Sequence, residues 1–481
     1  ALGRVDLGLG IDTFEYAGDD GQRLVQIGDN REVAIGDPGR VFMDLPAAGG
    51  GLTNVGEVLD ALARAMESGT ASQDTLTDID AAIDRRRGTG LYRANDAINS
   101  LSAGTLSTTI GYFTKLLPLI AWGFVLENFA LIDMPLGWFD ASPRGIALWV
   151  TAALAWDFCY YWFHRFSHEI SILWAAHAVH HQSEEYNLST ALRQTSTGFV
   201  FGWIFYLPLF VIGFPLEVLI TVNAVNLIYQ FWVHTRLIGR LGPLENVLMT
   251  PSHHRVHHAQ NERYIDRNYG GMLILWDRLF GTYEPERDED PVIFGVRKPL
   301  ASWNPFWANL QVYDYLMFDA RHARRWQDKL GIWFRRTGWR PPDVEARYPR
   351  KNVDLARFEK FDPVVSPMIR RYTVTQFLFA IVAVLWVGEV YVRGGAQAAI
   401  VPCVAVWALL LSLGMLNEGR PQARAFEFLR LLVLVPGILL TLHVTGTGVP
   451  ELAWIAAAVY MLASSAWLLL ANAQQLVHIK Q

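Results

Sequence analysis

The sequence predicts a mainly α-helical membrane protein that crosses the bilayer several times and begins with a small soluble segment of mixed α and β structure. Of the 481 residues, 52% are hydrophobic and 13% are aromatic. Several stretches of about 20 residues carry almost no charge, which is the length that an α-helix needs to cross a bilayer. Residues 1–84 hold 16 Asp or Glu against 5 Lys or Arg, although the whole chain has a net charge of only −5. An acidic soluble segment therefore precedes a basic, apolar body.

The acidic segment, residues 1–84, predicts both strands and helices. We expect two short strands in RLVQIGDNREVAIGD, joined by a turn at Gly28-Asp29-Asn30. Amphipathic helices are expected in TNVGEVLDALARAMESG and SQDTLTDIDAAID. Through these helices, YAGDDGQRLVQIGDN and VFMDLP, the segment resembles part of the flagellin-related hook–filament junction proteins. The composition changes near residue 85, which favours a fusion of two reading frames; a sensory or docking domain is the alternative.

Eight apolar stretches are expected to form membrane spans. They cover about 104–131, 145–163, 197–214, 215–233, 373–392, 398–416, 428–446 and 452–471. We therefore divide the remainder of the chain into a catalytic membrane domain (85–300), a polar block (301–371) and a C-terminal four-helix transmembrane region (372–481). Two cysteines, Cys159 and Cys403, lie in apolar stretches and are expected to be buried thiols rather than a disulfide or a metal site.

Basic residues mark one side of the membrane. Arginines precede the first predicted span, the second ends in FHRFSHE, and the short IGFPLE turn on the opposite side carries no basic residue. Because cytoplasmic loops are enriched in Lys and Arg, the basic side is expected to be cytoplasmic, in a bacterial inner membrane.

Three histidine clusters fall on that basic side. HRFSH contains His164 and His168, HAVHH contains the second cluster, and HRVHH repeats its spacing. Residues three and four apart share a face of a helix, so we expect each cluster to direct its imidazoles toward one point. His234, at the end of an apolar stretch, is expected at the same depth. The predicted metal ligands are His164, His168, His177, His180, His181, His234, His254, His257 and His258.

So many histidines exceed the needs of one metal ion and predict a site for two. Neutral imidazole suits iron, zinc, copper and nickel, whereas structural zinc commonly includes sulfur ligands. Redox-active iron fits a membrane-bound oxygen chemistry best, although the residues leave other transition metals open. His253 and Asp157 are expected beside the ligands, with Asp157 orienting a ligand histidine.

The motifs resemble the fatty acid hydroxylase/sterol desaturase superfamily of integral-membrane di-iron oxygenases, and within it the alkylglycerol monooxygenase family. The similarity is carried by YRANDAINSLSAG, HAVHHQSEEYNLSTALRQ, QFWVHT, TPSHHRVHHAQNERYIDRNYGG and LWDRLFGTYEPE. It implies that the nine histidines hold two irons, that O2 is a co-substrate, and that a lipid C–H bond is hydroxylated or desaturated. Electrons would come from a reduced pterin or from an electron-transfer protein, and no nucleic acid is involved.

Polar residues that follow the second cluster could either line the entrance for substrate or cofactor or brace the ligand helices. They are Glu184, Glu185, Tyr186, Asn187, Arg193 and Gln194. We expect a lipid oxygenase that cleaves ether lipids, with a sterol or carotenoid desaturase or hydroxylase as the alternative enzyme. A metal-binding membrane protein without catalysis and a flagellum-associated anchor are alternatives from other classes. The oligomeric state is left open.

Overall fold

The computed structural model describes the short segments 2–6, 12–16, 23–28, 31–35, 44–46 and 52–54, Asp84, and residues 90–444 and 451–479. The chain divides into two compact units, Ala1–Tyr92 and Arg93–Gln481.

The first unit contains three antiparallel strand pairs. They are β1 (Leu2–Asp6) with β2 (Asp12–Tyr16), β3 (Arg23–Gly28) with β4 (Arg31–Ile35), and β5 (Asp44–Pro46) with β6 (Leu52–Asn54). The β3–β4 pair confirms the hairpin predicted around Gly28-Asp29-Asn30. Apart from Asp84, the two helices predicted after residue 54 lie outside the described residues.

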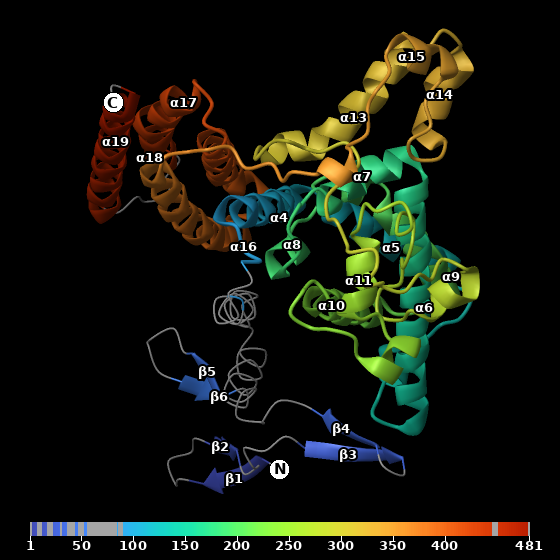
Figure 1. Cartoon of the computed structure of the whole chain (residues 1–481). Coiled ribbons are helices and arrows are strands. Elements are labelled where there is room, and N and C mark those ends of the chain that lie inside the picture. The colour runs from blue at the N-terminus through green and yellow to red at the C-terminus, as the bar shows by residue number, and fades with distance from the viewer. Residues whose placement is uncertain are drawn as a thin grey trace. The chain divides into compact units, whose positions relative to one another are not determined.

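The second unit is almost entirely helical (Figure 1). Its α-helices are α4 (Ala94–Thr114), α5 (Leu116–Phe129), α6 (Pro143–Glu169), α7 (Ser171–His181), α8 (Leu188–Ala191), α9 (Leu207–Ile212), α10 (Leu216–Trp232), α11 (Pro251–His257), α12 (Leu275–Phe280), α13 (Pro305–His322), α14 (Trp326–Phe334), α15 (Pro342–Arg347), α16 (Pro367–Asn417), α17 (Ala423–Leu429), α18 (Val435–Val444) and α19 (Glu451–Ile479). A π-helical turn, Arg430–Leu434, joins α17 to α18.

Four helical segments within the described residues are long and apolar enough to span a membrane: Pro143–Glu169, Pro367–Asn417, Ala423–His443 and Glu451–Ala471. The start of α6 is fixed by Ser142, whose hydroxyl accepts from the Gly145 N–H, and by proline at the first helical position. Large apolar side chains remain exposed along α5, α6, α10, α16 and α19. An extended exposed apolar surface of this kind faces lipid, so the protein is an integral membrane protein.

Four of the predicted spans differ in detail. The first is a pair of helices, α4 and α5, bent by 50°. Stretch 197–214 is not one helix but includes 3-10 turns and α9, which ends at Gly213 with a φ of 111°. The stretches 373–392 and 398–416 both fall within α16, whose helical path is broken at Gly395 with φ 71° and ψ −172°. Glycine accepts such a conformation without a Cβ clash, so the chain can leave the helix there.

Separate apolar cores hold these helices together. One lies between α4 and α16, a second joins α6, α9 and α10, and a third packs α16 with α17, the π-helical turn and α19. In Figure 1, α7 and α11 lie near the end of α6, with α13–α15 extending from the same region. The three histidine clusters are therefore on α6, α7 and α11, at the junction between membrane helices and the polar block.

Candidate metal centre

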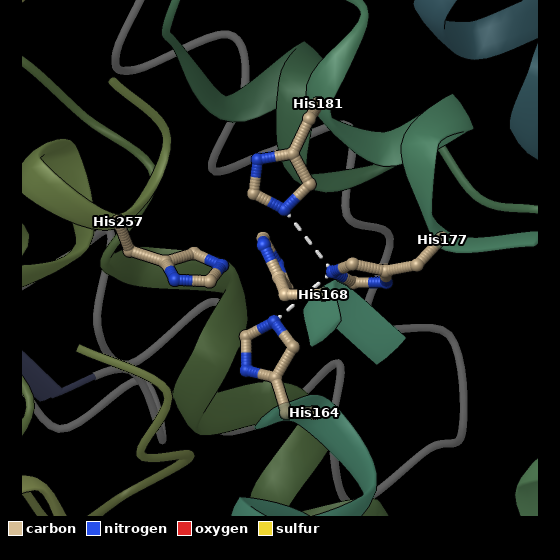
Figure 2. A group of neighbouring side chains, drawn as sticks. All are labelled: His164, His168, His177, His181 and His257. Carbon is tan, nitrogen blue, oxygen red and sulfur yellow. Dashed lines mark hydrogen bonds between the residues drawn. The ribbon is translucent and has the colours of Figure 1, made fainter. Parts of the chain in front are cut away.

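Nine histidines from four parts of the fold gather into two groups. The first group contains His164 and His168 from α6, His177 and His181 from α7, and His257 from α11. The second contains His180 from α7, His234 just after α10, and His254 and His258 from α11 and its C-cap. Within each group, one nitrogen per ring lies within 4.8 Å of all the others, which is close enough to hold one metal ion. Figure 2 shows the rings of the first group converging from separate elements.

Each H-x-x-H-H motif contributes to both groups. On α7, His177 and His181 join the first group and His180 joins the second; on α11, His254 and His258 join the second and His257 joins the first. The prediction that each cluster directs its rings toward one point therefore holds for His164 and His168, which both join the first group, and is wrong for the two H-x-x-H-H clusters. Residues four apart share a face, but adjacent residues on a helix point about 100° apart. The second histidine of each motif must then face a different group from the first and the third.

Backbone carbonyls fix the orientation of four rings, two in each group. In the first, the Nδ1 atoms of His164 and His257 lie 2.8 Å and 3.0 Å from the carbonyl oxygens of Tyr269 and Arg267. In the second, Nδ1 of His180 lies 2.9 Å from the Arg193 oxygen, and Nδ1 of His234 lies 2.7 Å from the Gln230 oxygen.

A carbonyl oxygen only accepts, so in the neutral state Nδ1 carries the proton and Nε2 carries a lone pair. The rings are neutral: burial lowers the pKa of His180 to about 4 and, with the neighbouring histidines, holds the pKa of His257 well below its usual value.

Two such lone pairs face each other in the second group. The Nε2 atoms of His180 and His234 are 3.1 Å apart, although neither has a proton to donate. In the first group, the Nε2 atoms of His168 and His257 are buried without a hydrogen-bond partner. Ring-nitrogen separations of 3.0–3.2 Å recur through both groups. Two ligands at right angles on one ion, with metal–nitrogen bonds of roughly 2.1 Å, would be about 3 Å apart. The donor set therefore fits bound metal ions.

Two buried carboxylates hold the loop that supplies the Tyr269 and Arg267 carbonyls. Asp277 accepts from the backbone N–H groups of Tyr269 at 2.7 Å and Gly270 at 2.8 Å. Asp157 accepts from the backbone N–H groups of Met272 at 2.7 Å and Leu273 at 3.1 Å, and also from the Trp276 indole and the Asn226 amide.

Asp157 therefore braces a loop, rather than orienting a histidine ring directly as predicted. Its hydrogen-bond partners among the described residues are on that loop, on α12 and on α10.

His253 lies outside both groups. Its Nδ1 accepts from the Thr250 N–H at 3.4 Å in a capping box at the start of α11, and its ring packs against Tyr283. Burial lowers its pKa to about 4. The residue thus supports the helix that carries three of the grouped histidines.

Three predicted residues brace the loop after α7. Glu184 accepts from the Phe361 N–H at 2.6 Å. Glu185, which is buried, forms ion pairs with Arg93 and Lys360. Tyr186 donates to the Val233 carbonyl at 3.0 Å, and its ring lies against that of His234.

The other three predicted residues stabilise the segment that follows this loop. Asn187 caps the short helix α8, and Gln194 donates to the Ala191 carbonyl. Arg193 is only 1% exposed and donates to the Val179 carbonyl, to Asn99 and to Gln182. Since its own carbonyl faces His180, Arg193 ties the backbone of α7 to a grouped ring.

A cavity of about 440 Å³ adjoins both groups. His168, His181 and His257 of the first group and His258 of the second line it, and its outer wall includes Arg297, Lys298 and Arg350. These three cations are not among the site residues predicted from the sequence. Arg297 and Lys298 are adjacent, Arg350 follows about 50 residues later, and only the fold brings the three together beside the grouped histidines.

The comparisons with known proteins agree with this architecture. Residues 149–282 match the sequence model of the fatty acid hydroxylase family. Alkylglycerol monooxygenase of Danio rerio is 38% identical over 346 residues, which is 71% of this chain and 75% of the relative. The Homo sapiens protein of the same name is 36% identical, with 71% of this chain and 75% of the relative covered.

Ornithine lipid hydroxylase of Rhizobium tropici is 30% identical over 30% of this chain and 44% of its own length. No solved structure matches the chain. The flagellar resemblance of residues 1–84 stays a prediction. The chain belongs to the alkylglycerol monooxygenase family of membrane-bound, oxygen-dependent oxidoreductases, within the fatty acid hydroxylase/sterol desaturase superfamily.

Proposed function

We propose that the protein is a di-iron monooxygenase that hydroxylates a membrane lipid next to an ether oxygen and thereby cleaves it. The observation that carries the proposal is the convergence of nine neutral histidines into two adjoining groups, four of them oriented by backbone carbonyls. His181 and His258, one from each group, stack with ring centroids 4.2 Å apart, so the two ions would be close neighbours. The similarity to alkylglycerol monooxygenases supports the ether lipid as substrate.

Iron bound by these imidazoles supplies the redox chemistry that reduces O2 and oxidises the substrate C–H bond. In the overall reaction, an alkyl carbon beside the ether oxygen gains one oxygen atom of O2. The other atom leaves as water after uptake of two electrons and two protons from a reductant. The resulting hemiacetal breaks its C–O bond to give an aldehyde and an alcohol.

The side chains of this protein contribute positioning and water exclusion. The carbonyls of Tyr269, Arg267, Arg193 and Gln230 hold four rings with Nε2 directed inward. All nine rings are largely buried, which limits the access of bulk water to the metal-binding nitrogens.

Metal content tests the proposal directly. We expect about two iron ions per chain, and a loss of roughly one with His181→Ala in the first group or with His234→Ala in the second. His322→Ala is the matched control, because His322 is part of neither group. Iron-free wild-type protein, or variants that keep the full iron content, would contradict the assignment.

Lipid analysis tests the reaction. A host that expresses the wild-type chain should convert an added alkylglycerol to a fatty aldehyde and glycerol, whereas the His181→Ala host should not. Supplying a reduced pterin or a reduced ferredoxin to purified protein identifies the electron donor. We propose that the grouped histidines face the cytoplasm of a bacterial inner membrane, since the basic loops lie on their side. Protease protection of loop tags in membrane vesicles checks that orientation.

A further inference from the structure

The cavity beside the grouped histidines is built from the polar part of the chain. Among the described residues that line it, His168 alone belongs to a candidate membrane span; the others come from α7, α11, α13 and connecting segments. Most of the lining therefore lies outside the candidate spans, where a polar group of a ligand can reach it. The volume of about 440 Å³ lies within the range typical of small-molecule sites.

Cations outnumber carboxylates along the lining. Arg297, Lys298, Arg340 and Arg350 face only two acidic side chains, Asp266 and Asp319. Asp319, 1% exposed, is shared by Arg340 at 2.8 Å and Arg350 at 2.9 Å. One carboxylate thus balances two guanidinium groups. Asp266 is paired with Arg336 at 3.2 Å, so it is not available to the other cations of the lining.

Lys298 and Arg297 have weaker electrostatic partners than Arg340 and Arg350. Among the described residues, no carboxylate lies within ion-pair distance of the Lys298 ammonium, which lies 6.0 Å from the ring centre of Tyr315. Burial, together with Arg350 and Arg340, lowers the pKa of Lys298 to about 8. Arg297 pairs at 3.2 Å with Glu262, whose side chain is 88% exposed, and such exposed pairs contribute little.

We propose that Arg297, Lys298 and Arg350 form a binding site for a phosphate oxyanion in this cavity. An oxyanion would compensate the excess positive charge and accept charge-assisted hydrogen bonds from these donors. Its source is either the phosphate-bearing headgroup of a lipid or a free phosphate. The lipid source rests on the proposed function, because a lipid anchored here would lie beside the grouped histidines that line the same cavity.

Binding measured by calorimetry on the full chain in detergent tests the site. The probes are 1-O-octylglycerol 3-phosphate, the neutral 1-O-octylglycerol and inorganic phosphate. For wild type we expect the alkyl phosphate to bind at least tenfold more tightly than the neutral analogue. Lys298→Met should weaken binding of the phosphate probes about tenfold, and Lys298→Arg should largely restore it. Lys329→Met, which removes an exposed cation outside the cavity, is the control.

The outcomes separate the two sources and the two proposals. Tighter binding of the alkyl phosphate than of inorganic phosphate assigns the site to a lipid headgroup, and equal binding assigns it to free phosphate. The calorimetry is repeated after a chelator has removed bound metal. The phosphate affinities measured in this way do not depend on the iron assignment, so they would be unchanged if that assignment failed. Phosphate affinity that is the same in Lys298→Met and Lys329→Met, with or without metal, overturns the oxyanion site.

Discussion

Asp277 is one of the two buried carboxylates that hold the loop whose carbonyls orient His164 and His257. Burial raises its pKa to about 6, so the group is still largely ionised above pH 7. Each oxygen serves one backbone N–H: Oδ1 accepts from Tyr269 at 2.7 Å and Oδ2 from Gly270 at 2.8 Å. Asp277→Asn keeps the shape but offers only one accepting oxygen. Its amide nitrogen would then face an N–H that has no other acceptor.

The expected losses of stability and of iron affinity follow from these contacts. A hydrogen bond to a charged acceptor contributes roughly 1.5–3 kcal/mol. In Asp277→Asn one such bond is lost, and the side-chain NH2 group and a backbone N–H then face each other as two donors. We therefore expect Asp277→Asn to lower the free energy of unfolding by at least that amount. Because the Tyr269 carbonyl then loses its fixed position, iron affinity should fall about 10- to 100-fold, as for other residues that orient metal ligands.

Two measurements on purified protein check this reasoning. Iron retained after competition with a chelator reports the metal affinity, and thermal unfolding in detergent reports stability. Asp288→Asn serves as the control, since the Asp288 side chain is 94% exposed and its ion-pair partner among the described residues is the half-exposed Arg240. If Asp277→Asn and Asp288→Asn retain iron equally and unfold at the same temperature, the loop does not position the histidines as argued.

Three further results are expected. His253→Ala should keep the full iron content and lose about 1 kcal/mol of stability, because His253 caps α11 rather than joining a group; loss of iron would contradict this. Metal-free protein should be most stable above pH 6.5 and lose stability toward pH 4, because the unfolded state protonates His180 first; a melting temperature that is flat over this window would refute it. Glu427→Gln should destabilise the C-terminal bundle by about 3–5 kcal/mol, since it leaves Arg430 buried without its counter-charge; exposed Glu389→Gln is the control for the melting measurement.

The sequence was most informative where spacing and composition restrict the structure. Long uncharged stretches predicted a helical membrane protein, and the histidine spacing selected eight of the nine residues that gather in the structure; the position of His234 at the end of an apolar stretch selected the ninth. It also separated His253 from His254, because adjacent residues on a helix point in different directions.

The remaining features depend on the tertiary structure. The carbonyls that orient His164 and His180 belong to Tyr269 and Arg193. Every residue type has a backbone carbonyl, so the sequence does not identify these acceptors. The bend between α4 and α5 was missed because hydropathy predicts where a span lies and not whether its helix is bent. Asp157 was predicted near the ligands from the cost of a charge in an apolar span, but its partners were set by a loop more than 100 residues away.

Helices α7 and α11 each contribute histidines to both groups, so the positions of the two groups are coupled. Helix α7 supplies two rings to the first group and one to the second, and α11 supplies the reverse. A shift of either helix would therefore displace nitrogens in both groups at once, so neither ion could be repositioned alone. Each group also contains two rings fixed by backbone carbonyls. This arrangement suits chemistry that needs two metal ions at a constant separation. Two independent structural metal sites would not require shared helices.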